Sequence, residues 1–259
     1  MGAVKKYKMK KINLPKQGSN HILVISGASG SGKTTTCALL EILYPNNYVH
    51  IPFDRSRASR PGEFGSKHVN IDTMFKKYYN GEYFNIASVT HNGYAAIRTA
   101  NIIQAFKKNK IAVIEYPLEQ IDILEKNFLN TYITVVELVA PSEQERFRRL
   151  KKDHKFTDQR IESSQFGSGR IDRYKNEGLL NLNDHNLVLI TERNRIRETV
   201  YIINRYMKIQ SLTLEKLSTL EKLYGIKGVQ NLLKSIAIPK YHYSKSENYD
   251  FLKNKLPQI

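Results

Sequence analysis

A glycine-rich segment near the N-terminus carries the strongest chemical signal in the sequence. It reads Gly27-Ala28-Ser29-Gly30-Ser31-Gly32-Lys33-Thr34 and follows the apolar run Ile22–Ile25. Four residues separate the first glycine from Gly-Lys-Thr, which is the spacing of a phosphate-binding P-loop. Glycines allow successive backbone N–H groups to face one anion, and the following helix adds its positive N-terminal end. The segment therefore predicts binding of a nucleoside triphosphate.

The side chains of this loop have distinct expected roles. Lys33 is expected to reach the β- and γ-phosphates, and the Thr34 hydroxyl is a candidate ligand of Mg²⁺. The expected ATP-binding residues are Gly27, Ser29, Gly30, Ser31, Gly32, Lys33, Thr34 and Thr35. A P-loop binds phosphates rather than the base, so ATP and GTP both remain open as the donor. We expect ATP and Mg²⁺ as cofactors.

Strand-like and helix-like segments alternate along the chain, which predicts an α/β fold with a parallel five-stranded sheet flanked by helices. Expected strands are Ile22–Ile25, Tyr48–Ile51, Ile111–Ile114, Ile133–Val139 and Leu187–Ile190. Expected helices are Thr34–Leu43, Ile97–Lys108 and a segment that starts at Pro141 and Ser142. Ligands of such sheets bind at the carboxyl ends of the strands, where the P-loop lies.

The remaining segments suggest how the chain is divided. A basic arm covers 1–19, a P-loop kinase core covers 20–207 and a helical extension covers 208–259. Two polar insertions interrupt the core at about 53–96 and about 151–177. We expect the first insertion to be a flap over the acceptor and the second to be a lid over the phosphates. Phosphoryl transfer needs such closure, since it excludes water that would otherwise accept the phosphoryl group.

Composition narrows the class of protein. The 259 residues are 41% hydrophobic, and no apolar run is long enough to span a membrane. The single cysteine, Cys37, excludes an intramolecular disulfide and is expected to be a small buried thiol. No His/Cys cluster has the sequence spacing of a zinc site. We expect a cytoplasmic protein.

The net charge of +17 leaves two interpretations open. Six lysines without an acid mark the N-terminal arm: Lys5, Lys6, Lys8, Lys10, Lys11 and Lys16. Such an arm is either a solvated tail or a contact for nucleic acid. The extension after Met207 carries two short helical patterns around Gly225, compatible with a hairpin on the core, an oligomer contact or DNA recognition.

Several motifs after the P-loop give the sequence a family resemblance. The block Arg57-Ala58-Ser59-Arg60-Pro61-Gly62-Glu63 is followed by Phe75 and by Gly81-Glu82-Tyr83-Phe84. With Gly27–Thr35, these motifs resemble guanylate kinase in order and near spacing, over about residues 20–205. The P-loop is specific for phosphate, and the R-x-x-R-x-G-E block indicates this family.

The resemblance implies roles for several residues. Arg57 and Arg60 match two arginines that hold the acceptor's phosphate, which suits guanidinium forks. Tyr94 matches a tyrosine at the same phosphate. Arg146, Arg148 and Arg149 match the start of the lid and Arg160 its far side, where they either stabilise the transferring group or simply solvate a helix. The implied catalytic residues are Lys33, Arg57, Arg60, Arg148 and Arg160.

Departures from the family occur where the guanine base is read. Asn85 stands at the position of a glutamate, Ala95 and Ala96 replace a glycine and a serine, and Pro117 replaces an aspartate. Glu115 still provides an acid that can orient Mg²⁺-bound water and contact the acceptor. An unpaired buried polar group costs about 1–3 kcal/mol, so these losses should weaken GMP recognition severely.

The phosphate-binding residues thus survive while the base-reading residues do not. We expect an ATP-dependent phosphotransferase acting on a phosphate-bearing acceptor, a nucleotide other than, or not only, GMP. An unusual acceptor remains open; a hydroxyl acceptor would need a base, for which Asp54, Glu63 and Glu115 are candidates. A binding module like those of scaffolding proteins is disfavoured, because such domains typically lose the P-loop and this one is intact. A nucleic-acid or protein-binding module that still binds nucleotide stays open as an alternative.

Overall fold

A computed structural model describes residues 20–57, 65–89, 93–129, 131–152, 186–192 and 195–208. The strands are β1 (His21–Gly27), β2 (Tyr48–His50), β3 (Asp54–Arg55), β4 (Lys67–His68), β5 (Tyr83–Val89), β6 (Gly93–Arg98), β7 (Ile111–Glu115), β8 (Tyr132–Val139) and β9 (Asn186–Ile190). The helices are α1 (Lys33–Leu43), α2 (Ile71–Tyr79), α3 (Thr99–Lys107), the 3₁₀ turn η1 (Leu118–Gln120), α4 (Ile121–Asn127), α5 (Glu143–Lys152) and a helix over 196–208.

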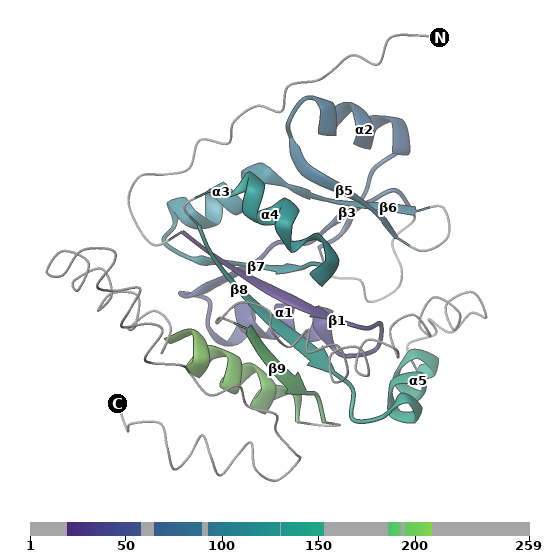
Figure 1. Ribbon diagram of the computed structural model, residues 1–259, viewed down its shortest axis with the longest axis vertical. Helices are drawn as coiled ribbons and strands as arrows, with labels where there is room; N and C mark the ends of the chain where they lie inside the picture. The colour runs from purple at the N-terminus through teal and green to yellow at the C-terminus, as the bar shows by residue number, and fades with distance from the viewer. Residues whose placement is uncertain are drawn as a thin grey trace, which may run out of the picture.

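The central sheet has the strand order β2-β7-β1-β8-β9, and each adjacent pair is parallel. Its strands are short apolar runs rich in valine and isoleucine, which suits strands that are covered on both faces. Figure 1 shows α3 and α4 on one side of this sheet, and α1 with the helix over 196–208 on the other. The predicted parallel sheet with flanking helices is therefore confirmed.

Each face of the sheet has its own hydrophobic core. On one face, α3 and α4 contribute Ile102, Phe106 and Leu124. On the other face, α1 contributes Cys37 and Leu40, and the helix over 196–208 contributes buried apolar side chains of its own. Alternation along β1 sends Ile22 and Val24 to the first core and Leu23 and Ile25 to the second. This two-sided packing fixes the end of β1, from which the P-loop leaves.

The chain between β2 and α3 forms a second sheet, in the order β4-β3-β6-β5. Strand β6 pairs antiparallel with both β3 and β5, and α2 packs on the sheet through the buried side chain of Met74. This sheet falls within the predicted insertion at about 53–96; its function as an acceptor flap stays a prediction.

One expected helix boundary was wrong. The apolar spacing of 97–108 predicted a helix from Ile97, but Ile97 and Arg98 end strand β6, and α3 begins at Thr99. Ile97 is buried in the core between the two sheets, and Arg98 pairs with Tyr83 across the β5–β6 ladder. Tertiary pairing has therefore overridden a local pattern that is compatible with either structure.

Several sequence expectations lie outside the described residues. These are the basic arm at 1–19, the lid from residue 153 onwards, and the extension from residue 209 onwards, together with Arg60, Glu63 and Arg160. Lys151 and Lys152, placed at the start of the lid by the sequence, are the last residues of α5. Within the described residues, no helix is long and apolar enough to cross a membrane.

Candidate active site

The P-loop connects β1 to α1 by a backbone path that requires glycine. Gly27 has φ 137°, and a Cβ atom there would lie 2.3 Å from the carbonyl oxygen of Leu138 on β8. Gly32, at the N-cap of α1, has φ 97° and ψ 11°, the left-handed conformation. Residues other than glycine rarely adopt such backbone angles. The backbone conformation therefore explains why the motif has glycine at both positions.

The first turn of α1 is built to accept an anion. Gly32 provides no side-chain hydrogen bond to the helix N-terminus, and the first turn contains no acidic residue. The N–H groups of a helix start carry partial positive charge and lack partners within the helix. Anions compete for such groups, and phosphate is a frequent ligand at this position.

Lys33 folds over the loop that precedes it. Its Nζ atom donates to the carbonyl oxygens of Gly27, at 2.8 Å, and Ala28, at 3.0 Å. The side chain is partly buried and its amine lies above the segment that the motif assigns to the phosphates. The positive charge is therefore already held at the loop by the loop's own backbone.

Ser31 offers a second sign of a phosphate site. Its Oγ atom is buried and has no hydrogen-bond partner, and it points towards Gly27, whose hypothetical Cβ atom would lie 2.6 Å away. A buried hydroxyl without a partner is unfavourable unless something else completes its bonding. Thr34 is partly exposed and Thr35 is exposed, so both hydroxyls are accessible from outside the loop.

Two arginines of α5 contact carbonyl oxygens of the P-loop backbone. Arg146 is 2% exposed; its Nη1 atom lies 3.3 Å from the carbonyl oxygen of Ser29, and its guanidinium pairs with Glu143. Arg149 donates from Nη1 to the Gly30 carbonyl at 3.4 Å and to the Thr191 hydroxyl at 2.9 Å. Neither arginine is a solvated surface residue, because both are committed to the backbone of the loop.

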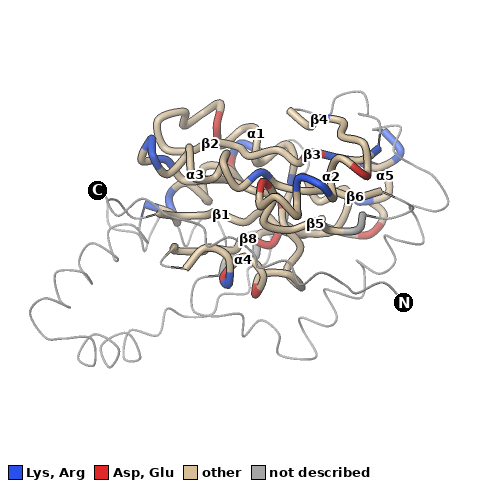
Figure 2. The backbone as a smooth tube through the Cα atoms, turned by 90° about the horizontal axis from the view of Figure 1, so that it is seen from above, with Lys and Arg blue, Asp and Glu red and all other residues tan. Residues whose placement is uncertain are grey.

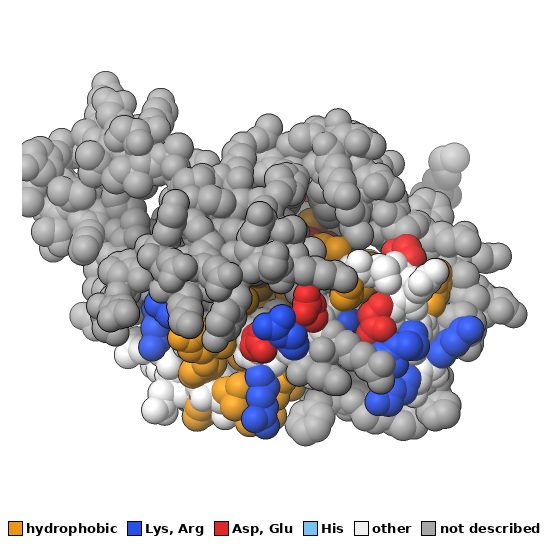
Figure 3. Space-filling view, turned by 90° about the horizontal axis from the view of Figure 1, so that it is seen from below, with side chains coloured by type: hydrophobic (Ala, Val, Ile, Leu, Met, Phe, Trp, Pro, Cys, Tyr) orange, Lys and Arg blue, Asp and Glu red, His pale blue; other side chains and the backbone are white. Residues whose placement is uncertain are grey.

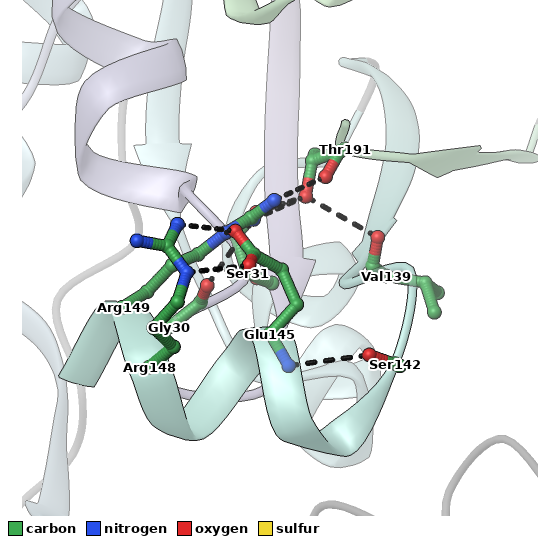
Figure 4. Close-up of polar contacts among 8 residues, drawn as sticks. All are labelled: Gly30, Ser31, Val139, Ser142, Glu145, Arg148, Arg149 and Thr191. Atoms are coloured by element: carbon green, nitrogen blue, oxygen red, sulfur yellow. Dashed lines mark hydrogen bonds and ion pairs between the residues drawn. The ribbon is translucent and has the colours of Figure 1, made fainter. Parts of the chain in front are cut away.

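Thr191 closes the same network, as Figure 4 shows. Its hydroxyl lies 2.8 Å from the carbonyl oxygen of Ser31 and 3.2 Å from that of Val139. It follows directly after β9, at the carboxyl edge of the sheet. Sequence reasoning missed this residue, although a hydroxyl just after a parallel strand is a signal that could have found it.

Arg148 differs from its neighbours on α5. Its side chain is 41% exposed and pairs with Glu145, with Nε 2.7 Å from Oε2. Glu145 also accepts from Arg149 at 3.0 Å. Hydrogen bonds from Arg148 and Arg149 lower the pKa of Glu145 to about 2. Of these three arginines, Arg148 has the most exposed side chain, at 41% against 2% for Arg146 and 19% for Arg149.

The backbone segments that carry Arg57 and Tyr94 lie side by side. Ser56 donates its N–H to the Tyr94 carbonyl at 2.9 Å, and Tyr94 donates its N–H to the Ser56 hydroxyl at 2.7 Å. The Tyr94 ring contacts the ring of Phe75 edge-on, with centroids 5.2 Å apart. The second sheet and α2 therefore position two of the residues that the resemblance assigns to the acceptor phosphate.

Asn85 connects the second sheet to the end of the central sheet. Its Nδ2 atom donates to the Tyr116 hydroxyl at 2.8 Å and to Oε1 of Gln120 at 2.7 Å. Both partners follow Glu115, the last residue of β7. Burial raises the pKa of Tyr116 to about 12, so its hydroxyl keeps its proton at neutral pH. Sequence reasoning identified Asn85 but not its two partners.

Asp54 has a structural role. It is 5% exposed, and its Oδ2 atom accepts from the Tyr83 hydroxyl and from Nε of Arg98, both at 2.6 Å. Burial, together with the bond to Asp54, raises the pKa of Tyr83 above its ordinary value. These contacts join β3, β5 and β6. One oxygen of the carboxylate considered as a base for a hydroxyl acceptor thus accepts two bonds within the second sheet.

Glu115 lies at the carboxyl end of β7 and pairs in register with Ile25 of β1. Ile25 is two residues before Gly27, where the P-loop begins. Neighbouring parallel strands end at the same edge of a sheet, so the acid and the loop face a common region. This placement matches the expected role of Glu115 at Mg²⁺ and at the acceptor, which stays a prediction.

Charged side chains in the described part of the chain are distributed rather than gathered by sign. Figure 2 shows Lys and Arg on several elements, and Figure 3 shows basic side chains beside acidic ones on the face seen from below. Arg98 with Asp54, Lys77 with Glu82 and Lys126 with Asp122 are examples of such pairs. These views add no support for the nucleic-acid interpretation, whose residues lie in the arm and the extension.

Comparison with known proteins agrees with this architecture. Guanylate kinase of Helicobacter pylori (strain ATCC 700392 / 26695) is 27% identical over 112 residues, 42% of this chain and 54% of that protein. Guanylate kinase of Wolinella succinogenes is 27% identical over 135 residues, 50% of this chain and 60% of that protein. The aligned region thus spans little more than half the length of these relatives. No family model matches the sequence.

A solved structure decides the fold. The crystal structure of guanylate kinase from Anaplasma phagocytophilum superposes with a TM-score of 0.52 at 19% identity, covering 75% of this chain and 87% of that one. The chain has a guanylate kinase-like P-loop kinase fold. Within this fold, the P-loop, α5 and Thr191 form one bonded unit, and Arg57, Tyr94 and Asn85 are carried by the second sheet.

Proposed function

We propose that this guanylate kinase-like chain is a phosphotransferase that uses Mg²⁺ and ATP to phosphorylate a phosphate-bearing acceptor, a nucleotide other than, or not only, GMP. The observation that carries the donor half is the P-loop itself. Its glycines adopt angles that other residues rarely reach, its helix start has no side-chain cap, and Lys33 lies across it. The relatives named guanylate kinase support the same reaction class.

The residues fit the proposed cofactor. The unpartnered Oγ atom of Ser31 and the N–H groups at the start of α1 are donors that a phosphate group would satisfy. Lys33 and Thr34 would hold the triphosphate and its metal ion, with Glu115 on the neighbouring strand. ATP would supply the transferable phosphoryl group. Because a phosphate acceptor is already ionised, the protein needs to position and neutralise charge rather than provide a base.

The arginines divide into two kinds in this proposal. Arg146 and Arg149 keep the loop in shape through its carbonyl groups, so they act on the donor indirectly. Arg148 is exposed enough to approach the phosphates, and with Arg160 of the lid it would neutralise charge on the transferring group. Arg57, Arg60 and Tyr94 would hold the acceptor's phosphate.

The choice of acceptor follows from Asn85. Because both amide hydrogens of Asn85 are donated to Tyr116 and Gln120, its side chain offers an acceptor oxygen and no further donor. Guanine presents two neighbouring donors, N1–H and the exocyclic amine, which call for two acceptor atoms. A base with one ring N–H beside a carbonyl fits better, since Tyr116 can donate its own proton to that carbonyl. Uracil, thymine and hypoxanthine have this pattern.

A phosphoryl-transfer screen tests the proposal. Purified chain is incubated with Mg²⁺ and labelled ATP against all ribo- and deoxynucleoside monophosphates, then against other phosphorylated metabolites and 5′-phosphorylated oligonucleotides. We expect turnover of UMP, dTMP or IMP ahead of GMP. Efficient use of GMP above the other nucleotides would overturn the acceptor assignment. ATP binding without transfer to any acceptor would overturn the phosphotransferase itself.

A further inference from the structure

Three side chains from three elements converge next to the P-loop. They are Cys37 on α1, His50 at the end of β2 and Glu115 at the end of β7, and one ligand atom of each lies within 4.8 Å of the others. The proposed reaction gives no role to Cys37 or His50. From the sequence, Cys37 was expected to be a buried core thiol. No metal-binding motif was recognised, because these three residues are far apart along the chain.

Sheet register explains why the three side chains meet. His50 pairs with Val113 across the β2–β7 ladder, and paired residues of parallel strands point to the same face. Glu115 lies two residues beyond Val113, so it also faces that side. Val113 packs in the same core as Cys37, which identifies the face as the one that α1 covers. The convergence is therefore built into the fold.

The donor set is that of a thiophilic metal ion. A thiolate, an imidazole and a carboxylate are the ligands that Zn²⁺ takes, and three protein ligands leave a fourth position open. Bonds of about 2.0–2.3 Å in a tetrahedron place ligand atoms about 3.5 Å apart, so atoms that lie within 4.8 Å of one another need to approach by about 1.3 Å at most. Mg²⁺ prefers oxygen ligands and six-fold coordination, so a sulfur and a nitrogen ligand select against it.

We propose that Cys37, His50 and Glu115 form a binding site for Zn²⁺ or a similar thiophilic divalent cation, which inhibits phosphoryl transfer by occupying Glu115. Binding forms one metal bond to each side chain and releases the thiol proton of Cys37 to solvent, with no change of oxidation state. The bound ion is then neutralised by one thiolate and one carboxylate. The inhibitory consequence rests on the proposed function; the metal site itself does not.

The proposed metal site is reached past His50 and lies close to the P-loop. Cys37 is fully buried, whereas His50 is half-buried, so the ion would enter past the imidazole. Burial, followed by the charge of Glu115, raises the pKa of the Cys37 thiol well above its ordinary value, so the metal ion has to displace the thiol proton. Lys33 lies nearby, and its amine is engaged by the carbonyls of Gly27 and Ala28. The metal site and the donor site therefore share one end of the sheet, where occupation of one affects the other.

Titration of the full-length chain with Co²⁺, followed by displacement with Zn²⁺, tests the metal site without any assay of activity. We expect one equivalent of Co²⁺ to bind with a thiolate-to-cobalt charge-transfer band, which Cys37→Ser removes. His50→Gln should weaken Zn²⁺ binding at least tenfold, whereas His68→Gln, an exposed histidine on β4, should not. Because Cys37 is in the core, Cys37→Ala and circular dichroism check that loss of the band is not loss of folding.

The outcomes separate the two proposals. Absence of the charge-transfer band, or equal binding by the wild type and His50→Gln, would overturn the site. Binding of Zn²⁺ with transfer undiminished at saturation would overturn the inhibition. If one equivalent of Zn²⁺ binds through the three residues and no acceptor is ever phosphorylated, the metal site stands and the proposed function fails.

Discussion

The amide nitrogen of Asn85 lies 2.8 Å from the hydroxyl of Tyr116, and this bond connects the second sheet to the end of β7. With the bond to Gln120, it fixes which atoms of Asn85 remain for a ligand. The position at which the resemblance expects a base-reading carboxylate thus holds an amide whose donors are turned towards the protein. We therefore expect base selection to differ from that of the family that the chain resembles.

Replacement Asn85→Glu is predicted to raise kcat/KM for GMP by about 10–100-fold, because one hydrogen bond to a charged group contributes about 1.5–3 kcal/mol. The carboxylate offers two acceptors, and Tyr116 can donate to it once the amide is gone. Steady-state kinetics with GMP and with the preferred acceptor measure the change.

Asn85→Gln is the matched control for that replacement. It has the length of glutamate without the charge, and we expect no gain with GMP. An equal gain in both variants would assign the effect to side-chain length. No gain in either would mean that the acceptor is not a purine nucleotide.

Lys33→Met is predicted to lower kcat by about 10²–10³-fold or more, because it removes the cation that is proposed to neutralise the transferring phosphate. Methionine keeps most of the apolar stem, so circular dichroism and the melting temperature should change little. A polymer-binding role of the basic arm would instead persist in this variant and weaken with salt. Unaltered transfer by Lys33→Met would contradict the proposed mechanism.

The sequence predicted those parts of the fold that depend on local pattern. The P-loop and β1 carry their signal within a dozen residues, and the parallel strands appear as apolar runs of the right length. The bond from Arg149 to Thr191 joins residues 42 positions apart, and no local pattern indicates that the two residues meet. The boundary at Ile97 failed for the same reason, since its pairing partner lies elsewhere in the chain.

The site shows the same division. Its phosphate-binding half is a contiguous motif, so residue types and spacing were enough to identify it. The Asn85 network forms where the second sheet meets the segment after β7, and the Cys37, His50 and Glu115 cluster depends on the register of β2 and β7. Both bring together residues that are distant in the sequence. Register between strands depends on how residues that are distant in the sequence pack together, so no short segment reveals it.

Arg146→Met is predicted to destabilise the fold by about 2–3 kcal/mol, through loss of the buried bonds to Ser29 and Glu143. For a chain of this size this corresponds to a decrease in Tm on the order of 5–10 °C. The P-loop should also lose its support, so KM for ATP should rise more than kcat falls.

Glu143→Gln is the comparison for Arg146→Met, because Glu143 is 41% exposed and its loss leaves the arginine bonded to Ser29. Its effect on Tm should be smaller. Thermal unfolding of the two variants measures the difference. A larger effect of Glu143→Gln would show that the ion pair, rather than the contact with the loop, carries the stability.

Arg148→Ala is predicted to act mainly on kcat, whereas Arg149→Ala is predicted to act on Tm and on KM for ATP. Arg149 is bonded to Gly30 and Thr191, so its loss should lower Tm and raise KM for ATP. Arg148 is 41% exposed and bonded to Glu145, so its loss should lower Tm less than the loss of Arg149 does. It should lower kcat, because the proposed mechanism uses Arg148 to neutralise charge on the transferring group. Tm and steady-state kinetics of the two variants separate these roles; unchanged kcat in Arg148→Ala would remove that arginine from the mechanism.

Glu145 gives α5 a predictable response to acid. Its pKa is lowered from about 4.5 to about 2 by the bonds from Arg148 and Arg149. A carboxyl group with a depressed pKa contributes stability that is present above its ordinary pKa and is lost as pH falls towards the folded value. The Tm of the wild type should therefore exceed that of Glu145→Gln at pH 7, and the difference should shrink as pH decreases from about 4.5 to about 2. A difference that stays constant over this range would show that the charge of Glu145 contributes nothing to the stability of the P-loop support.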